Sequence, residues 1–437
     1  MSLVAAACSD GDGTAAATGD GSSPTTAAEP AAAAYAAPAQ HPSDWQAPEV
    51  ALPAVTLPYG PSPQATADPA FYDVTTLDAD EVGAAQPGEV LRSEAVELTG
   101  PLRGAEGWRV LYRSTDADGD PAVVSGMVLA PEGPPPPEGR PVAAWAHGTT
   151  GIADRCAPSA TGNLFYDDYA QVGRDLLDAG FVVAATDYHG LGTPGVHSYH
   201  DSEELARATI DSVAVAHGLD EAGPLADQWL VVGHSEGGLA ALATDERAGL
   251  HPPGLDYRGA VVAAPSAQLG AVAPAMFAVP GRGYGVLLLE AVAEDVPDLD
   301  PAVSLGAEAA GREALVTHGC WEEAVPGFDD IPPEEMLADP SVGTRLGEAL
   351  SRCCASDPAA ANGPLLVVHG EVDESLPLVL SDELVADLCA AGVVVDYRTY
   401  PGAGHDAVMA ASSADTTAWM SARLAGEAAP SNCDGAG

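Results

Sequence analysis

The chain has 437 residues and a formal net charge of −48, from 64 acidic residues against 16 basic ones, all of them arginine. This acidity argues against nucleic-acid partners, because contacts with phosphate groups need clustered lysine and arginine side chains. The sequence has no run of about 18 or more apolar residues, so no segment is expected to span a bilayer.

The N-terminal stretch MSLVAAACSDGDG contains a run of small residues that ends in Cys8. It resembles the cleavage end of a bacterial lipoprotein signal, in which the cysteine becomes the lipid-bearing first residue. The charged start and long apolar segment of a whole signal peptide are missing from it, and Ala5 stands where an aliphatic residue is usual. Two interpretations stay open. One is a membrane tether through Cys8 on an extracellular or cell-envelope protein, and the other is a disordered tail with an incidental cysteine.

Residues 1–68 are expected to form this start and a flexible tether, because Ala, Gly, Ser, Thr and Pro dominate the composition there. Ordered structure is expected to begin near Phe71. From there apolar strands alternate with longer helical stretches, which predicts an α/β fold with a mostly parallel sheet flanked by helices.

Apolar, β-branched runs predict strands at 108–114, 122–130, 141–146, 181–188, 229–234, 257–264, 364–370 and 393–400. The first two are expected to form a hairpin across the turn DADGDP. Helices are expected at about 166–179, 202–217, 236–248, 376–391 and 407–424.

One interval breaks this alternation, because no core strand is expected between Ser266 and Asn362. A compact domain does not leave such a length as loop, so residues 266–362 are expected to form an inserted, mostly helical cap over the strand ends. The core would then comprise residues 69–265 and 363–426, and residues 427–437 would form a C-terminal tail.

The stretch VVGHSEGGLA places Ser235 between an apolar run and a helix-forming segment. A sharp strand-to-helix turn strains its central residue, and side chains two positions away would collide. Gly233 and Gly237 meet that requirement, and Gly238 lets the helix pack closely. The pattern therefore predicts a nucleophile elbow with Ser235 as the attacking group.

A serine hydroxyl needs a base to accept its proton, and a third group to orient that base. Asp373 lies in HGEVDESLP after the strand at 364–370, and His405 lies in YPGAGHDAV after the strand at 393–400. The chain order Ser235, Asp373, His405 is the one expected of α/β-hydrolases.

Several other titratable residues compete with this set. Glu371 is two residues from Asp373 and is a rival acid, although the motif places Asp373 better. His234, beside the nucleophile, is expected to pack or to form hydrogen bonds. His197 and His200 in HSYH have the spacing of two metal ligands, but no third ligand suggests itself, so a surface loop is the favoured interpretation.

Preset donors must stabilise the negative charge of a tetrahedral intermediate. One candidate is the backbone N–H of Glu236, directly after the serine. The second is expected from HGTTG after the strand at 141–146, whose glycines let backbone amides face the pocket, so either Thr149 or Thr150 fits. The sequence does not choose between these two threonines.

Seven cysteines are present, and the six beyond Cys8 form an even number that suits disulfides in an exported protein. The adjacent Cys353 and Cys354 are expected to bridge to different partners, because sequence neighbours strain to bridge each other. The chain has no C-x-x-C pair and no cysteines close to paired histidines, so a zinc site is not expected. Catalysis by Ser235, Asp373 and His405 implies neither a metal nor an organic cofactor.

The chain resembles the secretory lipase family of α/β-hydrolases, the lipase-A type, over about residues 70–425. The resemblance is carried, in chain order, by PGEVLRSEAVEL, WRVLYRSTDADGDPAVVSGMVLAP, HGTTG with RCAPS, DYHGLGTPGVHSY, GHSEGG, HGEVDESLP and GAGHD. It implies an α/β-hydrolase fold with an inserted helical cap and a lipase or carboxylesterase activity. The nucleophile, acid and base of the family would be Ser235, Asp373 and His405, and the oxyanion residue would fall near Thr150.

The expected activity is therefore two-step hydrolysis of a small-molecule or lipid ester by a serine hydrolase. In the cap, Leu287, Leu288 and Leu289 either line an acyl tunnel or form ordinary helix core. One rival is a serine exopeptidase on the same fold, for which EAVAEDVPDLD would supply carboxylates to hold a substrate amine. A second rival is a non-catalytic binding protein, which the intact set of three residues argues against.

Overall fold

The computed structural model describes residues 62–433 except 251, 253 and 294. Cys8 and most of the expected tether lie outside the described residues. None of the helices in the described part of the chain combines the length and apolar character needed to cross a membrane.

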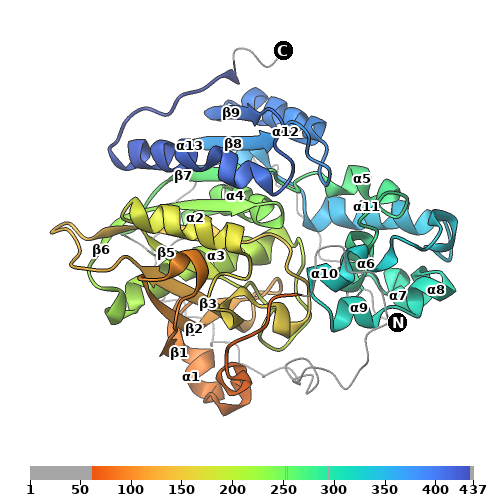
Figure 1. Cartoon of the computed structure of the whole chain (residues 1–437), viewed down its shortest axis with the longest axis horizontal. Helices are drawn as coiled ribbons and strands as arrows, with labels where there is room; N and C mark the ends of the chain where they lie inside the picture. Colours follow the sequence, from red (N-terminus) through yellow and green to blue (C-terminus); the bar gives the residue numbers. More distant parts are fainter. Residues whose placement is uncertain (1–61, 251, 253, 294, 434–437) are drawn as a thin grey trace, which may run out of the picture. The chain divides into compact units, whose positions relative to one another are not determined.

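The described residues form a nine-stranded sheet in the order β1-β2-β3-β5-β4-β6-β7-β8-β9 (Figure 1). Strands β1 to β3 pair antiparallel, β3 pairs antiparallel with β5, and every later pair is parallel. The strands are β1 Val90–Ala95, β2 Glu106–Thr115, β3 Pro121–Ala130, β4 Arg140–Ala146, β5 Val182–Thr186, β6 Leu225–His234, β7 Asp256–Ala263, β8 Leu365–Gly370 and β9 Val395–Tyr400. The expected α/β class with a mostly parallel sheet flanked by helices is confirmed, and β2 and β3 form the expected hairpin.

The first strand, β1, is the one that the sequence did not predict. Its run VLRSEA carries three polar or charged residues in six, and none of its residues is fully buried. An edge strand of this kind is stabilised by its pairing with β2 more than by its own apolar pattern.

Helices cover both faces of the sheet. Alternate residues along β4 point to opposite faces, with Val142 and Ala144 in one apolar cluster and Ala143 and Trp145 in the other. The first cluster contains residues of α3, α4 and α12, and the second contains residues of α2 and α13. The helices outside the β7–β8 interval are α1 Ala79–Ala84, α2 Asp167–Asp178, α3 Ser202–Gly218, α4 Glu236–Glu246, α12 Leu378–Ala390 and α13 Ala407–Leu424.

The interval between β7 and β8 is made mainly of short helices, which gather beside the sheet in Figure 1. They are α5 Leu269–Met276, α6 Gly283–Val292, α7 Pro301–Ser304, α8 Ala307–Ala310, α9 Ala314–Thr317, α10 Trp321–Ala324 and α11 Ser341–Cys353. The apolar side chains of this interval join the cluster that contains α3 and α4. Its action as a cap over the site stays a prediction.

Both ends of the described chain make contacts where the sequence predicted unattached segments. Within the expected tether, Ser62 is buried, and its hydroxyl donates to Glu322 Oε2 at 2.7 Å. In the expected tail, Asn432 donates its backbone N–H to Val395 of β9 at 3.1 Å. Polar, small residues gave no packing signal here, so these boundaries depend on contacts with distant segments.

Candidate active site

Ser235 lies at a sharp turn between β6 and α4, with φ 60° and ψ −116°. This left-handed backbone is strained for a residue with a side chain. A Cβ atom at Gly233 would overlap the carbonyl oxygen of Gly237, and one at Gly237 would overlap that of Ala146. Glycine is therefore required two residues before and two residues after the serine, as the sequence predicts.

The hydroxyl of Ser235 lies 2.9 Å from Nε2 of His405. His405 is supplied by the loop between β9 and α13, and its Nδ1 lies 2.7 Å from Oδ2 of Asp373 in the loop after β8. The other carboxylate oxygen of Asp373 accepts the backbone N–H groups of Ser375, at 2.9 Å, and Leu376, at 2.7 Å. The structure thus brings the three predicted residues into one hydrogen-bonded chain.

Glu371, the rival acid, lies elsewhere. Its carboxylate accepts a hydrogen bond from the hydroxyl of Thr399 at 2.9 Å, on the exposed edge of the sheet. Asp373, in contrast, has a side chain that is fully buried against His405. The geometry therefore favours Asp373 as the group that orients the imidazole.

The electrostatic environment keeps Asp373 ionised and His405 basic. Burial raises the pKa of Asp373, but hydrogen bonds from His369 and His405 outweigh it and leave that pKa well below its usual range. Burial lowers the pKa of His405, but the hydrogen bond to Asp373 and the charges of Asp373, Asp406 and Glu374 raise it above its ordinary value. An ionised carboxylate thus supports an imidazole that binds a proton readily.

The expectation that His234 packs and forms hydrogen bonds is confirmed. Its Nδ1 lies 3.1 Å from the hydroxyl of Tyr169, and its Nε2 lies 3.0 Å from the carbonyl oxygen of His405. Burial and the neighbouring His405 lower the pKa of His234 to about 3, so it stays neutral. A neutral ring of this kind supports the backbone of His405 without adding a charge.

The favoured interpretation of HSYH as a surface loop was wrong. His197 and His200 are only 1% and 3% exposed. Nε2 of His197 lies 3.1 Å from the carboxylate of Glu236, and Nε2 of His200 lies 2.8 Å from the hydroxyl of Ser266. Each ring therefore has a buried hydrogen-bond partner that the sequence pattern alone could not place.

The two candidate threonines for the oxyanion site have different environments. Thr149 borders the cavity that contains Ser235, and its hydroxyl lies 2.8 Å from that of Tyr199. Thr150 is 1% exposed, and its carbonyl oxygen accepts the backbone N–H of Trp321 at 2.8 Å. Only Thr149 faces the space in front of the serine. Glu236, the other expected donor, is the first residue of α4, where backbone N–H groups have no partner within the helix.

A cavity of about 330 Å³ opens in front of Ser235 and His405. Sequence reasoning missed most of its walls, because they come from distant segments with no shared motif. The aromatic walls are Tyr166, Tyr169, Tyr284 and Trp321, and the carboxylate walls are Asp167, Asp168, Glu322, Glu374 and Asp406. Tyr284, Trp321 and Glu322 come from the interval between β7 and β8.

A second cavity of about 40 Å³ also borders Ser235 and His405. Its apolar walls are Leu269, Met276, Leu288 and Leu376. The three leucines considered in the sequence, Leu287, Leu288 and Leu289, are all buried in the apolar cluster with α3 and α4, and Leu288 also lines this cavity. All three therefore belong to the helix core, and only Leu288 is in addition a cavity wall.

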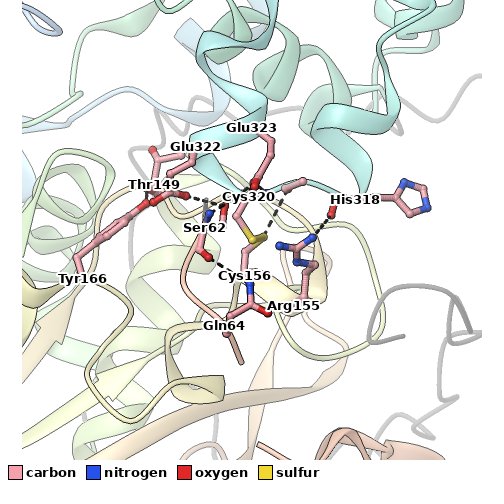
Figure 2. The surroundings of a disulfide bond; sticks show 11 residues. Ser62, Gln64, Thr149, Arg155, Cys156, Tyr166, His318, Cys320, Glu322 and Glu323 are labelled. Atoms are coloured by element: carbon pink, nitrogen blue, oxygen red, sulfur yellow. Dashed lines mark hydrogen bonds between the residues drawn. A yellow bond between two sulfur atoms is a disulfide. The ribbon is translucent and has the colours of Figure 1, made fainter. Parts of the chain in front are cut away.

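A disulfide joins Cys156, close after the HGTTG loop, to Cys320, directly before α10 (Figure 2). Beside it, Arg155 donates a hydrogen bond to the carbonyl oxygen of His318 at 3.2 Å. Trp321 follows the bonded cysteine and lines the larger cavity. The disulfide therefore ties one cavity wall to the segment that carries Thr149.

The expectation that Cys353 and Cys354 bridge to different partners was wrong. The structure joins these neighbours to each other at the end of α11. The remaining cysteines of the described chain are already paired, as Cys156–Cys320 and Cys389–Cys433. No further described cysteine is left as a partner for either residue.

One group of described residues approaches the geometry of a metal site: side-chain ligand atoms of His234, His405 and Asp406 lie within 4.8 Å of one another. Both ring nitrogens of each histidine already have protein partners, including Tyr169 for His234 and Asp373 for His405. We therefore assign these rings to the hydrogen-bonded chain and its support.

Comparison with known proteins finds a matching family model and relatives that are named lipases. The family model described as Secretory lipase matches residues 164–432. A probable inactive lipase of Mycobacterium tuberculosis is 27% identical over 371 residues, which cover 78% of this chain and 80% of that protein. Lipase 6 of Candida albicans is 24% identical over 385 residues, which cover 80% of each chain.

Solved structures show the same fold. The closed state of Candida antarctica lipase A has a TM-score of 0.69 at 17% identity, covering 83% of this chain and 87% of that one. A rice cell wall degrading esterase from Xanthomonas oryzae has a TM-score of 0.61 at 18% identity, covering 78% of this chain and 98% of that one.

Proposed function

Because this chain belongs to the secretory lipase family, we propose that it is a serine carboxylesterase that cleaves esters through an acyl-enzyme intermediate. Family membership and fold support hydrolysis of carboxylic esters. The observation that carries the serine mechanism is the chain of short hydrogen bonds from Ser235 through His405 to Asp373, at the wall of an open cavity.

In the proposed reaction, His405 Nε2 accepts the hydroxyl proton while Ser235 Oγ attacks the ester carbonyl carbon. The tetrahedral intermediate collapses, and His405 returns the proton to the departing alcohol. A water molecule, deprotonated by the same nitrogen, then attacks the acyl-enzyme and releases the acid. Asp373 holds Nδ1–H throughout and stabilises the imidazolium when it forms.

The negative oxygen of both intermediates needs donors that are already in place. We assign the backbone N–H of Glu236 as one donor, because it follows the nucleophile at the start of α4. We assign Thr149 rather than Thr150 as the second, since only Thr149 borders the cavity. A Thr149→Val variant tests whether the hydroxyl takes part, with loss of kcat as the expected result and Thr150→Val as the matched control.

We propose that the smaller cavity receives the acyl group. Its walls are apolar, but its volume of about 40 Å³ has room for only a short chain in this arrangement. p-Nitrophenyl acetate and butyrate should therefore be cleaved faster than the decanoate or palmitate. Leu288→Ala lengthens the cavity and should shift the preference toward longer chains, whereas Leu287→Ala serves as a control inside the helix core.

The test of the mechanism is Ser235→Ala, with Ser421→Ala on the exposed face of α13 as the control. The serine variant should lose turnover by several orders of magnitude and should no longer react with a fluorophosphonate probe. Near-normal activity in that variant contradicts the proposed mechanism. The probe also separates an enzyme from a non-catalytic relative, which matters because the M. tuberculosis protein is named a probable inactive lipase.

We propose an extracellular or cell-envelope location. The family is the secretory lipase family, and the three disulfides among the described residues are of a kind that persists in oxidising compartments. Lipid attachment at Cys8 would place the protein on the envelope. Metabolic labelling with a palmitate analogue, compared between the native chain and Cys8→Ser, tests this: label in both, or in neither, contradicts attachment there.

The acidic lining of the larger cavity is the observation that favours the alternative function, a serine exopeptidase. The described carboxylates of EAVAEDVPDLD are absent from the walls of the larger cavity, but five others line it. Such a lining would favour a substrate that carries an amine or ammonium group. Aminoacyl p-nitroanilides, assayed beside p-nitrophenyl butyrate, discriminate the two: faster turnover of the anilides favours the peptidase.

A further inference from the structure

The carbonyl oxygen of Ser235 is held by several donors. The N–H groups of Gly238 and Leu239, in the first turn of α4, donate to it at 2.9 and 3.2 Å. Ser266, which follows β7, donates both its backbone N–H and its hydroxyl, each at 3.2 Å. Because the backbone of Ser235 is strained, such contacts are needed to keep Oγ aimed at its base.

The hydroxyl of Ser266 has a second partner, Nε2 of His200 at 2.8 Å. A hydroxyl has one proton, and that proton goes to the carbonyl oxygen of Ser235, so Nε2–H of His200 donates to Oγ of Ser266. The other ring nitrogen, Nδ1, is buried and has no hydrogen-bond partner within the described part of the chain. A ring with its single proton on Nε2 fits both observations.

The charge state of the ring agrees with this assignment. Burial lowers the pKa of His200 to about 4, so the imidazole is neutral wherever His405 can act as a base. His200 also has φ 68°, a left-handed backbone that other contacts of the structure must maintain. Two strained residues, His200 and Ser235, are therefore joined through one hydroxyl.

We propose that His200 is a positioning residue for the nucleophile, acting through the hydroxyl of Ser266 on the backbone carbonyl of Ser235. Among the hydrogen bonds of residues 62–433, none joins His200 or Ser266 to His405 or Asp373. The effect is thus on where Oγ points, not on the proton transfer itself. This inference rests on the proposed function, since the position of Oγ matters only if Ser235 is the nucleophile.

The test compares variants that keep or remove the hydrogen-bond donor at Nε2 of His200. His200→Leu removes it, His200→Gln keeps an N–H near the place of Nε2, and Ser266→Ala removes the bridging hydroxyl. For p-nitrophenyl acetate, kcat should fall about tenfold in the Leu and Ala variants, with KM nearly unchanged, and the Gln variant should recover most of the loss. His217→Leu, a half-buried histidine at the end of α3, is the matched control and should keep the native rate.

Two further measurements separate positioning from general damage. Inactivation by a small fluorophosphonate should slow by the same factor as kcat, because it reports the reactivity of the serine itself. The losses of His200→Leu and Ser266→Ala should not add in the double variant, because the first acts through the second. If His200→Leu does not fold, Ser266→Ala against Ser266→Thr, which keeps the hydroxyl, provides the same comparison.

The outcomes decide the inference. Additive losses, native kcat in both single variants, or a change confined to the KM of longer acyl esters would overturn it, since Ser266 and His200 also border the smaller cavity. Turnover in Ser235→Ala, or no fluorophosphonate labelling of the native protein, would instead overturn the proposed function. The two failures are therefore distinguishable.

Discussion

Replacement of Asp373 by asparagine is the sharpest test of the hydrogen-bonded chain. Oδ1 accepts two backbone N–H groups, from Ser375 and Leu376, so the asparagine oxygen must occupy that place. The amide nitrogen then takes the place of Oδ2 and faces Nδ1 of His405, 2.7 Å away in the native protein. Because the amide donates, Nδ1 must accept, and the imidazole proton moves to Nε2.

With its proton on Nε2, the ring cannot accept the hydroxyl proton of Ser235. The expected loss of kcat is about 10⁴-fold, the size known for this exchange in a serine hydrolase with the same relay. That factor corresponds to a rise of about 5.5 kcal/mol in the activation barrier. The assay is p-nitrophenyl butyrate hydrolysis near neutral pH, with thermal unfolding of the variant measured in parallel.

A matched control is Asp387→Asn, the same exchange on the exposed face of α12, which should leave kcat unchanged. The reasoning is refuted if Asp373→Asn keeps a rate within tenfold of the native protein while folding normally. It would also be refuted if the two asparagine variants lost activity equally.

The pKa of His405, the close approach at Gly237 and the Cys156–Cys320 disulfide each give a measurable expectation. The proposed mechanism requires neutral His405, whose pKa is raised, so kcat/KM should fall with decreasing pH through a midpoint above about 6.5; a midpoint below this in the native protein would contradict that direction. Gly237→Ala forces a Cβ against the carbonyl of Ala146 and should lower the free energy of unfolding by about 1–3 kcal/mol in urea titrations, whereas an unchanged midpoint would argue against the close approach. Removing the Cys156–Cys320 disulfide by double alanine substitution opens a link across 164 residues and should cost about 5 kcal/mol of stability, measured with guanidinium chloride; native stability would show that the bond closes no constrained loop.

Local patterns in the sequence predicted most of the sheet and the three residues of the candidate site. Apolar runs located eight of the nine strands, because burial on both faces leaves a continuous hydrophobic signal. The spacing of Gly233, Ser235 and Gly237 predicted the elbow, since only glycine avoids the collisions that the turn creates. Asp373 and His405 could be selected because parallel strands place the loops at their carboxyl ends along one edge of the sheet.

Only the tertiary structure decided what surrounds those three residues. The aromatic and acidic walls of the larger cavity come from segments with no common period or motif. The burial of His197 and His200, the pairing of Cys353 with Cys354 and the attachment of Ser62 depend equally on contacts between distant parts of the chain. The local sequence pattern indicates which secondary structure a residue adopts and whether its segment is buried. It does not indicate which residue far away in the sequence will contact it, because that contact depends on the fold of the whole chain.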